Sequence, residues 1–164
     1  MCAHPALLFS IITIRHFSRW GIDFMTCTPT WTGGLKYNIV AVDYFMKWVE
    51  PMPIIKNDGE TTTILIFNQV IARFKVPKQI ITHHGIHFEN AMMKELAPLL
   101  GFWHDQFSHY YPQFNVQVEA VNKVIKTMLQ REVNKHQTNW NIMCFLALWD
   151  YRTSVKNVIG FTLF

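Results

Sequence analysis

Hydrophobic residues in this chain follow two periodicities, and the order in which the two alternate limits the folds open to it. Residues 19–26 and 37–54 are rich in β-branched and aromatic side chains, and the turn-type sequence TPTWTGGLK lies between them. Such runs favour strands, so the first segment predicts one strand and the second predicts a hairpin of two. Three strands are therefore expected to open the domain.

The remainder of the chain alternates between helical and strand patterns. Helices are predicted at 57–74, 89–101, 117–136 and 139–154, and short strands at 79–83 and 102–107. Apolar residues at helical spacing support the first two helices: Ile64, Phe67, Val70, Ile71 and Phe74 in one, and Met92, Leu96, Leu99 and Leu100 in the other. Because proline disfavours a helix interior, Pro98 does not allow the sequence to fix where the second helix ends. The order β-β-β-α-β-α-β-α-α predicts an α/β layer fold with a mixed sheet.

Composition narrows the class of protein. The chain has 164 residues, of which 50% are hydrophobic and 15% aromatic, and this suits one domain with a core rather than a disordered chain. Its net charge of +4 permits a polyanionic partner without requiring one. Three scattered cysteines with no CxxC pair favour neither a disulfide framework nor a Cys-based zinc module, and they suit a reducing compartment. The apolar run PALLFSIITI is too short to span a bilayer, so we expect no targeting signal and no membrane partner.

Residues 81–90, ITHHGIHFEN, place a Gly-containing turn after a short β-branched run. In many phosphoryl-transfer enzymes this layout delivers an acidic residue to the end of a strand, yet position 83 is His83. Asp23 lies in an apolar strand pattern, so its carboxylate is expected near the end of the strand that starts at 79. This layout raises the question of whether residues 81–90 belong to an active site whose central ligand is missing.

Glu119 begins a long predicted helix, and Lys123 and Lys126 follow on the same face. An acidic residue beside two lysines suits a metal ligand next to a phosphate-binding edge. The spacing alone favours the other interpretation, an exposed Glu–Lys pair on a solvated helix face.

Five blocks of the sequence, taken in order, resemble the integrase catalytic core of gypsy-type LTR retrotransposons. They are WGIDF, YNIVAVDYFMKW, VPKQIITHHGIHFEN, YYPQFNVQVEAVNK and ALWDYRTS. The resemblance runs from about Trp20 to the C-terminus and implies an RNase H-like fold, with a central five-stranded mixed sheet flanked by helices. It divides the chain into an unplaced segment, residues 1–18, and an integrase core-like domain, residues 19–164.

That family is a polynucleotidyl transferase, which joins element DNA to host DNA with two divalent ions, Mg²⁺ or Mn²⁺, held by two Asp and one Glu. The corresponding positions here are Asp23, His83 and Glu119, and the 35 residues between the last two match the family spacing. His83 stands in place of the second Asp, which leaves Asp23 and Glu119 as metal ligands. We expect weak metal binding, because a neutral imidazole brings one nitrogen and no negative charge.

The resemblance also implies DNA, both element ends and target, as the partner. The residues expected to contact DNA are Lys123, Lys126, Tyr111 and Gln113. A homodimer and a nuclear location are further expectations from the same source.

Two other groups of residues are candidate metal ligands. Asp43 lies on a strand, but the family block that contains it is structural, so we interpret it as a non-ligand. His83, His84 and His87 suggest zinc, since imidazole is a good zinc ligand. HHxxH is not a structural-zinc spacing, however, and no Cys lies near it in the sequence.

Departures from the family pattern gather around the expected site. Phe114 and Val116 replace small residues in the loop before Glu119, and Val116 removes a glycine suited to a hinge. Ile86 replaces a small polar residue in the turn after His83. The family continues beyond the point where this chain stops at GFTLF, which predicts an isolated core truncated at its C-terminus.

Three hypotheses remain open. The first is an integrase core by descent, with nucleic-acid binding and impaired catalysis. The second is a non-catalytic nucleic-acid-binding or dimerisation module that uses Lys123, Lys126 and the aromatic loop at Tyr110 and Tyr111. The third is a nuclease that takes Mn²⁺ or Zn²⁺ through His83, because softer ions accept imidazole better than Mg²⁺ does.

Overall fold

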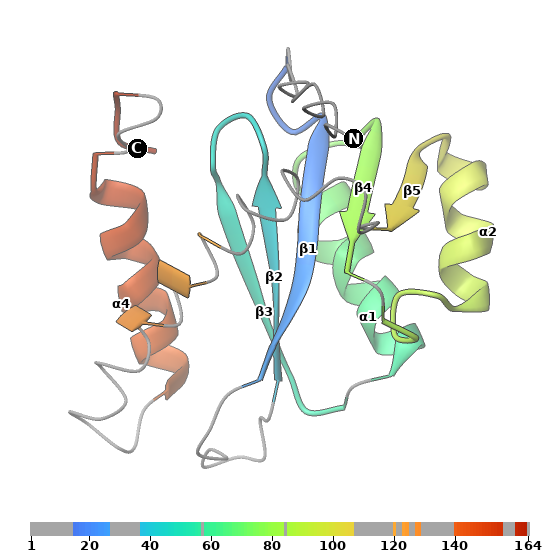
Figure 1. Ribbon diagram of the computed structural model, residues 1–164, viewed down its shortest axis with the longest axis horizontal. Helices are drawn as coiled ribbons and strands as arrows, with labels where there is room; N and C mark the ends of the chain where they lie inside the picture. Colours follow the sequence, from blue (N-terminus) through green and yellow to red (C-terminus); the bar gives the residue numbers. More distant parts are fainter. Residues whose placement is uncertain are drawn as a thin grey trace, which may run out of the picture.

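The computed structural model describes residues 15–26, 37–56, 58–83, 85–106, 140–155 and 160–163, and the short helical stretches at 120, 123–124 and 127–128. Five strands form a single sheet: β1 (Arg19–Thr26), β2 (Tyr37–Asp43), β3 (Val49–Ile54), β4 (Gln79–Thr82) and β5 (Trp103–Gln106). Their order across the sheet is β3-β2-β1-β4-β5 (Figure 1). The predicted first strand and hairpin are confirmed.

The sheet is mixed, as the sequence predicts. β1 pairs antiparallel with β2, and β2 with β3. β1 pairs parallel with β4, and β4 with β5. β1 and β4 therefore point in the same direction. In an open α/β sheet, side chains from separate segments can meet at the C-terminal ends of such parallel strands.

Helices flank this sheet. They are α1 (Gly59–Ile66), its wider π-helical continuation η1 (Phe67–Ile71), α2 (Ala91–Leu100) and α4 (Trp140–Thr153). Figure 1 shows α4 beside β3, on the other side of the molecule from α2. None of the described helices combines the length and the apolar character that crossing a membrane requires.

Both faces of the sheet are covered. One face forms the main core together with α1, η1 and α2. The core includes Trp20, Ile22, Ile39, Ala41, Met52, Ile54, Ile66, Val70, Ile80, Phe88 and Met93. Strand residues alternate between faces, and those of the opposite face, such as Val40, Val42, Val49 and Ile81, are buried as well. Burial on both sides explains why these strands read as continuous apolar runs.

The buried side of α1 differs from the one predicted. Asp58 caps the helix by accepting the N–H of Thr61 at 2.7 Å. Thr62, Thr63 and Ile66 are the buried residues of α1, whereas Ile64 is 43% exposed and Phe67, at the start of η1, is 40% exposed. The threonine hydroxyls donate to backbone carbonyls one turn back, so they enter the core with their hydrogen bonds satisfied.

The predicted apolar side of α2 is confirmed in part. Leu96 and Leu100 pack against the core, where Met93 and Ala97 are the buried residues, whereas Met92 is 40% and Leu99 is 80% exposed. The helix continues through Pro98 to Leu100 and ends at Gly101, whose φ of 75° lies in the left-handed region that glycine adopts without strain.

Candidate functional site

β1 and β4 bring Asp23 and His83 side by side. The parallel register pairs Ile22 with Thr82, so the next residues of the two strands, Asp23 and His83, are neighbours. The backbone N–H of His83 donates to the carbonyl oxygen of Ile22 at 3.4 Å, which carries the ladder one residue beyond β4. Ile22 and Thr82 face the main core, and alternation therefore places Asp23 on the opposite face of the sheet.

The two side chains differ in setting. Asp23 is half-buried, and its Oδ1 accepts the N–H of Phe24 at 2.8 Å. His83 is exposed. A carboxylate whose position is fixed by a backbone hydrogen bond suits the binding of a hard cation. The exposed imidazole beside it adds a softer nitrogen donor.

The turn after His83 is anchored by packing. The Gly85 carbonyl accepts the N–H of Phe88 at 2.9 Å, and Phe88 is buried against Phe24 with ring centroids 4.8 Å apart. His87 packs edge-on to Phe24 at 5.2 Å. Among the described residues no three His, Cys, Asp or Glu side chains are grouped to hold a metal ion, and His84 and Glu119 lie outside that set.

The remaining predicted site residues lie mostly outside the described part of the chain. These are Glu119, Tyr111, Gln113 and Lys126. Lys123 is described, lies in a helical stretch and is exposed, and its carbonyl accepts the hydroxyl of Thr127 at 2.8 Å. The convergence of Glu119 with Asp23 and His83 stays a prediction.

Asp43 lies at a different place from Asp23. It pairs with Trp20, at the other end of β1, and is fully buried. Its Oδ2 accepts the N–H of Met46 at 2.7 Å, within the turn that joins β2 to β3. Burial raises the pKa of the Asp43 carboxyl, and hydrogen bonds from the backbone of the turn oppose that shift. These contacts suit a turn-forming residue.

β2 adds a buried amide to the Asp23 face, which the sequence analysis missed. Asp23 pairs with Val40, and Met25 pairs with Asn38, so Asn38 lies diagonally across from Asp23 on the same face. Asn38 is fully buried, and neither its Oδ1 nor its Nδ2 has a hydrogen-bond partner. The available signal was an amide in the otherwise apolar run YNIVAV.

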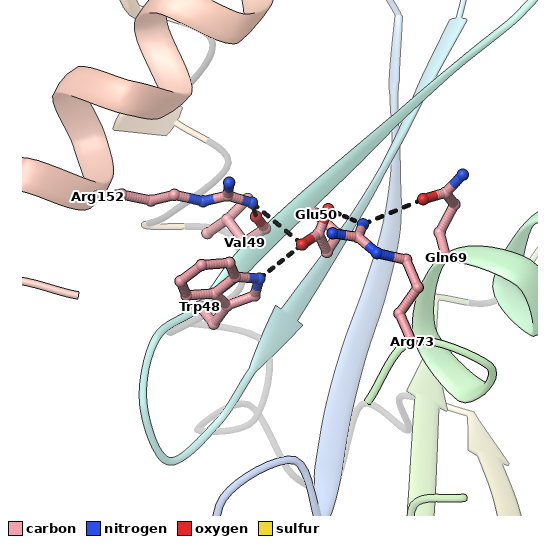
Figure 2. A network of polar contacts seen from close by, with 6 residues as sticks. All are labelled: Trp48, Val49, Glu50, Gln69, Arg73 and Arg152. Carbon is pink, nitrogen blue, oxygen red and sulfur yellow. Dashed lines mark hydrogen bonds and ion pairs between the residues drawn. The ribbon is translucent and has the colours of Figure 1, made fainter. Parts of the chain in front are cut away.

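A second polar cluster joins β3, η1 and α4 and does not include Asp23 (Figure 2). Glu50 accepts hydrogen bonds from Arg73 at 2.8 Å, from Arg152 at 3.1 Å and from the indole of Trp48 at 2.7 Å. The Arg152 guanidinium lies 4.0 Å from the centre of the Trp48 ring. Burial lowers the pKa of Arg152, and the charge of Glu50 opposes that shift.

A groove of about 330 Å³ lies next to this cluster. It is lined by Glu50, Pro51, Met52, Leu65, Gln69, Arg73, Phe145, Leu148, Trp149 and Arg152. Arg152 also donates to the Val49 carbonyl at 2.6 Å, and the Tyr151 hydroxyl donates to the Lys47 carbonyl at 3.2 Å. The cluster therefore docks α4 against the hairpin, a structural role.

Comparison with known proteins identifies relatives for this arrangement. No family model matches the sequence. The chain is 30% identical over 141 residues to the Pol polyprotein of Radiation murine leukemia virus (strain Kaplan), which is 85% of this chain and 24% of that protein. It is 32% identical over 144 residues to the Gag-Pol polyprotein of Baboon endogenous virus (strain M7), covering 87% of this chain and 8% of that one. The chain thus spans a quarter or less of these relatives.

Solved structures share the fold. The HTLV-2 integrase catalytic core domain, determined in complex with magnesium in a trimeric form, matches with a TM-score of 0.71 and 23% identity over 89% of this chain and 93% of that one. The catalytic core domain of BIV integrase matches with a TM-score of 0.73 and 20% identity over 89% and 90% of the two chains. A chain of the simian T-cell lymphotropic virus intasome, in complex with the PP2A regulatory subunit B56 gamma, matches with a TM-score of 0.77 and 20% identity over 89% and 52%.

The sheet order, the flanking helices and these relatives point to one conclusion. The chain has the RNase H-like fold of retroviral integrase catalytic cores and is homologous to a segment of retroviral Pol polyproteins.

Proposed function

We propose that this chain is an integrase core-like domain of gypsy-type retrotransposon descent that binds DNA and in which strand transfer is impaired. The observation that carries the proposal is the placement of His83, directly after β4, beside Asp23 in the neighbouring parallel strand β1. Sequence relatives among retroviral Pol polyproteins and the integrase fold support descent from an integrase core, and the gypsy-type assignment rests on the five sequence blocks. DNA as partner, a homodimer and a nuclear location belong to the same proposal.

Asp23 and Glu119 are the residues that would hold divalent ions. When bound, two such ions activate the attacking oxygen and stabilise the leaving oxygen of an in-line phosphoryl transfer. Asp23 supplies a half-buried carboxylate oxygen next to the exposed His83, and a carboxylate oxygen suits Mg²⁺. His83 contributes neither negative charge nor oxygen, so two carboxylates remain where three are needed. The expected result is weak ion binding and loss of strand transfer.

The direct test restores the missing ligand. His83→Asp is combined with Val116→Gly, and strand transfer on a branched DNA substrate is measured in Mg²⁺. We expect activity in the double variant and none in the unmodified chain. Adding Asp23→Asn to the double variant is the control and should abolish the recovered activity. Equal activity of the unmodified chain and the double variant would contradict the proposal.

A second function is favoured by the exposure of His83 next to Asp23. Imidazole is a better ligand for Zn²⁺ and Mn²⁺ than for Mg²⁺, so the unmodified chain would then be a nuclease with altered metal preference. The same substrate, tested with Mn²⁺ and Zn²⁺, distinguishes the two functions. DNA cleavage that disappears in His83→Ala would support the nuclease.

A further inference from the structure

Asn38 stands out among the described residues whose buried polar atoms have no hydrogen-bond partner. Trp20, Asp43, Gln79 and Arg152 each leave one buried polar atom without a partner, whereas Asn38 leaves both its amide oxygen and its amide nitrogen unpaired. A buried polar atom with no partner has lost its hydration without compensation. Asparagine is also disfavoured within strands. Within the part of the chain that the structure describes, no side chain pairs with this amide, so a bound group is a candidate partner.

The strand register indicates where that partner lies. Strand residues that surround Asn38 on its face of the sheet are Met25, Val40, Pro51, Pro53 and Asp23. Of these only Asp23 has a polar side chain. Diagonal neighbours in an antiparallel pair have Cα atoms about 7–8 Å apart, which leaves room for one small group between the ends of two short side chains. The separation suits a contact through one intervening water.

We propose that Asn38 is a positioning residue of the cation site at Asp23, where its amide oxygen accepts a hydrogen bond from a water bound to a divalent cation. This inference rests on the proposed function, since it requires a cation at Asp23. Mg²⁺ keeps several of its waters when carboxylates bind it, and a second-sphere acceptor holds such a water in place. Asn38 is fully buried, so this contact requires the amide to turn toward Asp23 when the cation binds.

Asn38 thereby offsets part of what His83 removes. A neutral amide oxygen is a hard acceptor and adds no charge, so it orients the hydration shell of the cation without replacing the lost carboxylate. The site is accordingly weaker than one with three carboxylates, but more selective for a hydrated hard ion than Asp23 alone.

The test measures metal binding rather than turnover. Titration of Mg²⁺ and Mn²⁺ by calorimetry is done on the unmodified chain and on His83→Asp, each with and without Asn38→Leu. Loss of an outer-sphere partner of a metal site lowers metal affinity by roughly 10- to 100-fold, and we expect that loss from Asn38→Leu. Thermal melts without metal should show Asn38→Leu at least as stable as its parent, because the orphan amide is gone.

Three outcomes separate the alternatives. If Asn38→Leu stabilises the fold and leaves the titration unchanged, the amide is a packing defect and the inference is wrong. If His83→Asp binds metal in a manner that Asp23→Asn abolishes, the proposed site stands whatever Asn38 does. If neither the unmodified chain nor His83→Asp binds metal, the proposed function and this inference both fail. Should Asn38→Leu not fold, Asn38→Asp serves instead, and an unchanged Mg²⁺ affinity in that variant would overturn the inference.

Discussion

Single side chains decide the chemistry of this fold at the end of β4. Asp23 and His83 are neighbours across β1 and β4, so an imidazole rather than a carboxylate at position 83 would set both the charge and the donor atom beside Asp23. On the other face of β4, Thr82 is fully buried and its hydroxyl lies 3.0 Å from Nε2 of His104. A histidine thus lies near each face of this short strand, His83 directly after β4 and His104 on the neighbouring β5, and the two are in different environments.

His104 should make stability depend on pH. Burial lowers the pKa of His104 below its ordinary value of 6.5, and the charges of Asp105 and Glu89 oppose that shift. The unfolded chain therefore takes up a proton more readily than the folded chain, so stability present above pH 6.5 is lost as the pH falls below it. Urea unfolding of the parent and of His104→Gln, followed across this range, measures the effect.

The His104→Gln variant is expected to show a flatter dependence on pH. Glutamine keeps a polar group near Thr82 but does not titrate. An identical slope in both proteins would assign the pH dependence to other groups.

At the scale of elements, the two helices that cover the main core are joined at their first turns by Asn90. Its Oδ1 caps α2 by accepting the N–H of Met93 at 2.9 Å, while its Nδ2 donates to the Gly59 carbonyl of α1 at 3.0 Å. A Cβ built at Gly59 would lie 2.7 Å from the Asn90 Cβ, which is closer than such atoms approach. Glycine at position 59 therefore permits this contact.

Asn90→Ala should destabilise the fold by roughly 2–3 kcal/mol, the sum of a lost helix cap and a lost buried hydrogen bond. Asn90→Asp is the control, because it keeps the capping oxygen while removing the amide donor to Gly59 and Thr63 of α1 and to the His87 carbonyl. We expect an intermediate loss for the control in chemical denaturation. Equal losses for the two variants would show that the cap contributes nothing.

The docking of α4 is a second feature of element scale. Arg152 reaches from α4 to the Val49 carbonyl and to Glu50, and Arg73 reaches the same carboxylate from the end of η1 (Figure 2). A buried carboxylate between two guanidinium groups is well compensated, and removal of one partner would leave charge unpaired. Both segments thus depend on one residue of the edge strand.

At the scale of the whole molecule, the proposed DNA partner makes a prediction about charge. The net charge is +4, and Lys123 is exposed in the helical stretch that follows Glu119 in the sequence. A basic surface binds phosphates with release of counterions, which makes affinity depend on salt. This property can be measured even if the chain is catalytically inactive.

Replacing Lys123 and Lys126 together with Ala should weaken DNA binding alike for different sequences and reduce the salt slope by about one to two units. The control is the pair Lys75→Ala and Lys94→Ala, which removes the same charge from exposed positions elsewhere. Fluorescence anisotropy over a series of salt concentrations measures the slope. A slope that falls equally in both pairs would make the effect one of net charge alone.

Much of the architecture could be predicted from local pattern. The first strand, the hairpin and the alternation of helices with short strands follow from side-chain periodicity, which acts within a few residues and needs no distant partner. The 35-residue separation of His83 from Glu119 is likewise a property of the chain. These features, with the five sequence blocks, sufficed to indicate the fold and to place a histidine where the family has an acid.

Other features depended on contacts between distant segments. Ile64, Phe67, Met92 and Leu99 have apolar side chains at helical spacing, yet they are exposed, because each helix has apolar residues on more than one side and packing against the sheet selects among them. The proximity of Asn38 to Asp23 arises only from the register of β1 with β2, and that of His83 from the register of β1 with β4. Register is set by how whole strands bury their faces, so only the tertiary structure could decide which polar groups share the site.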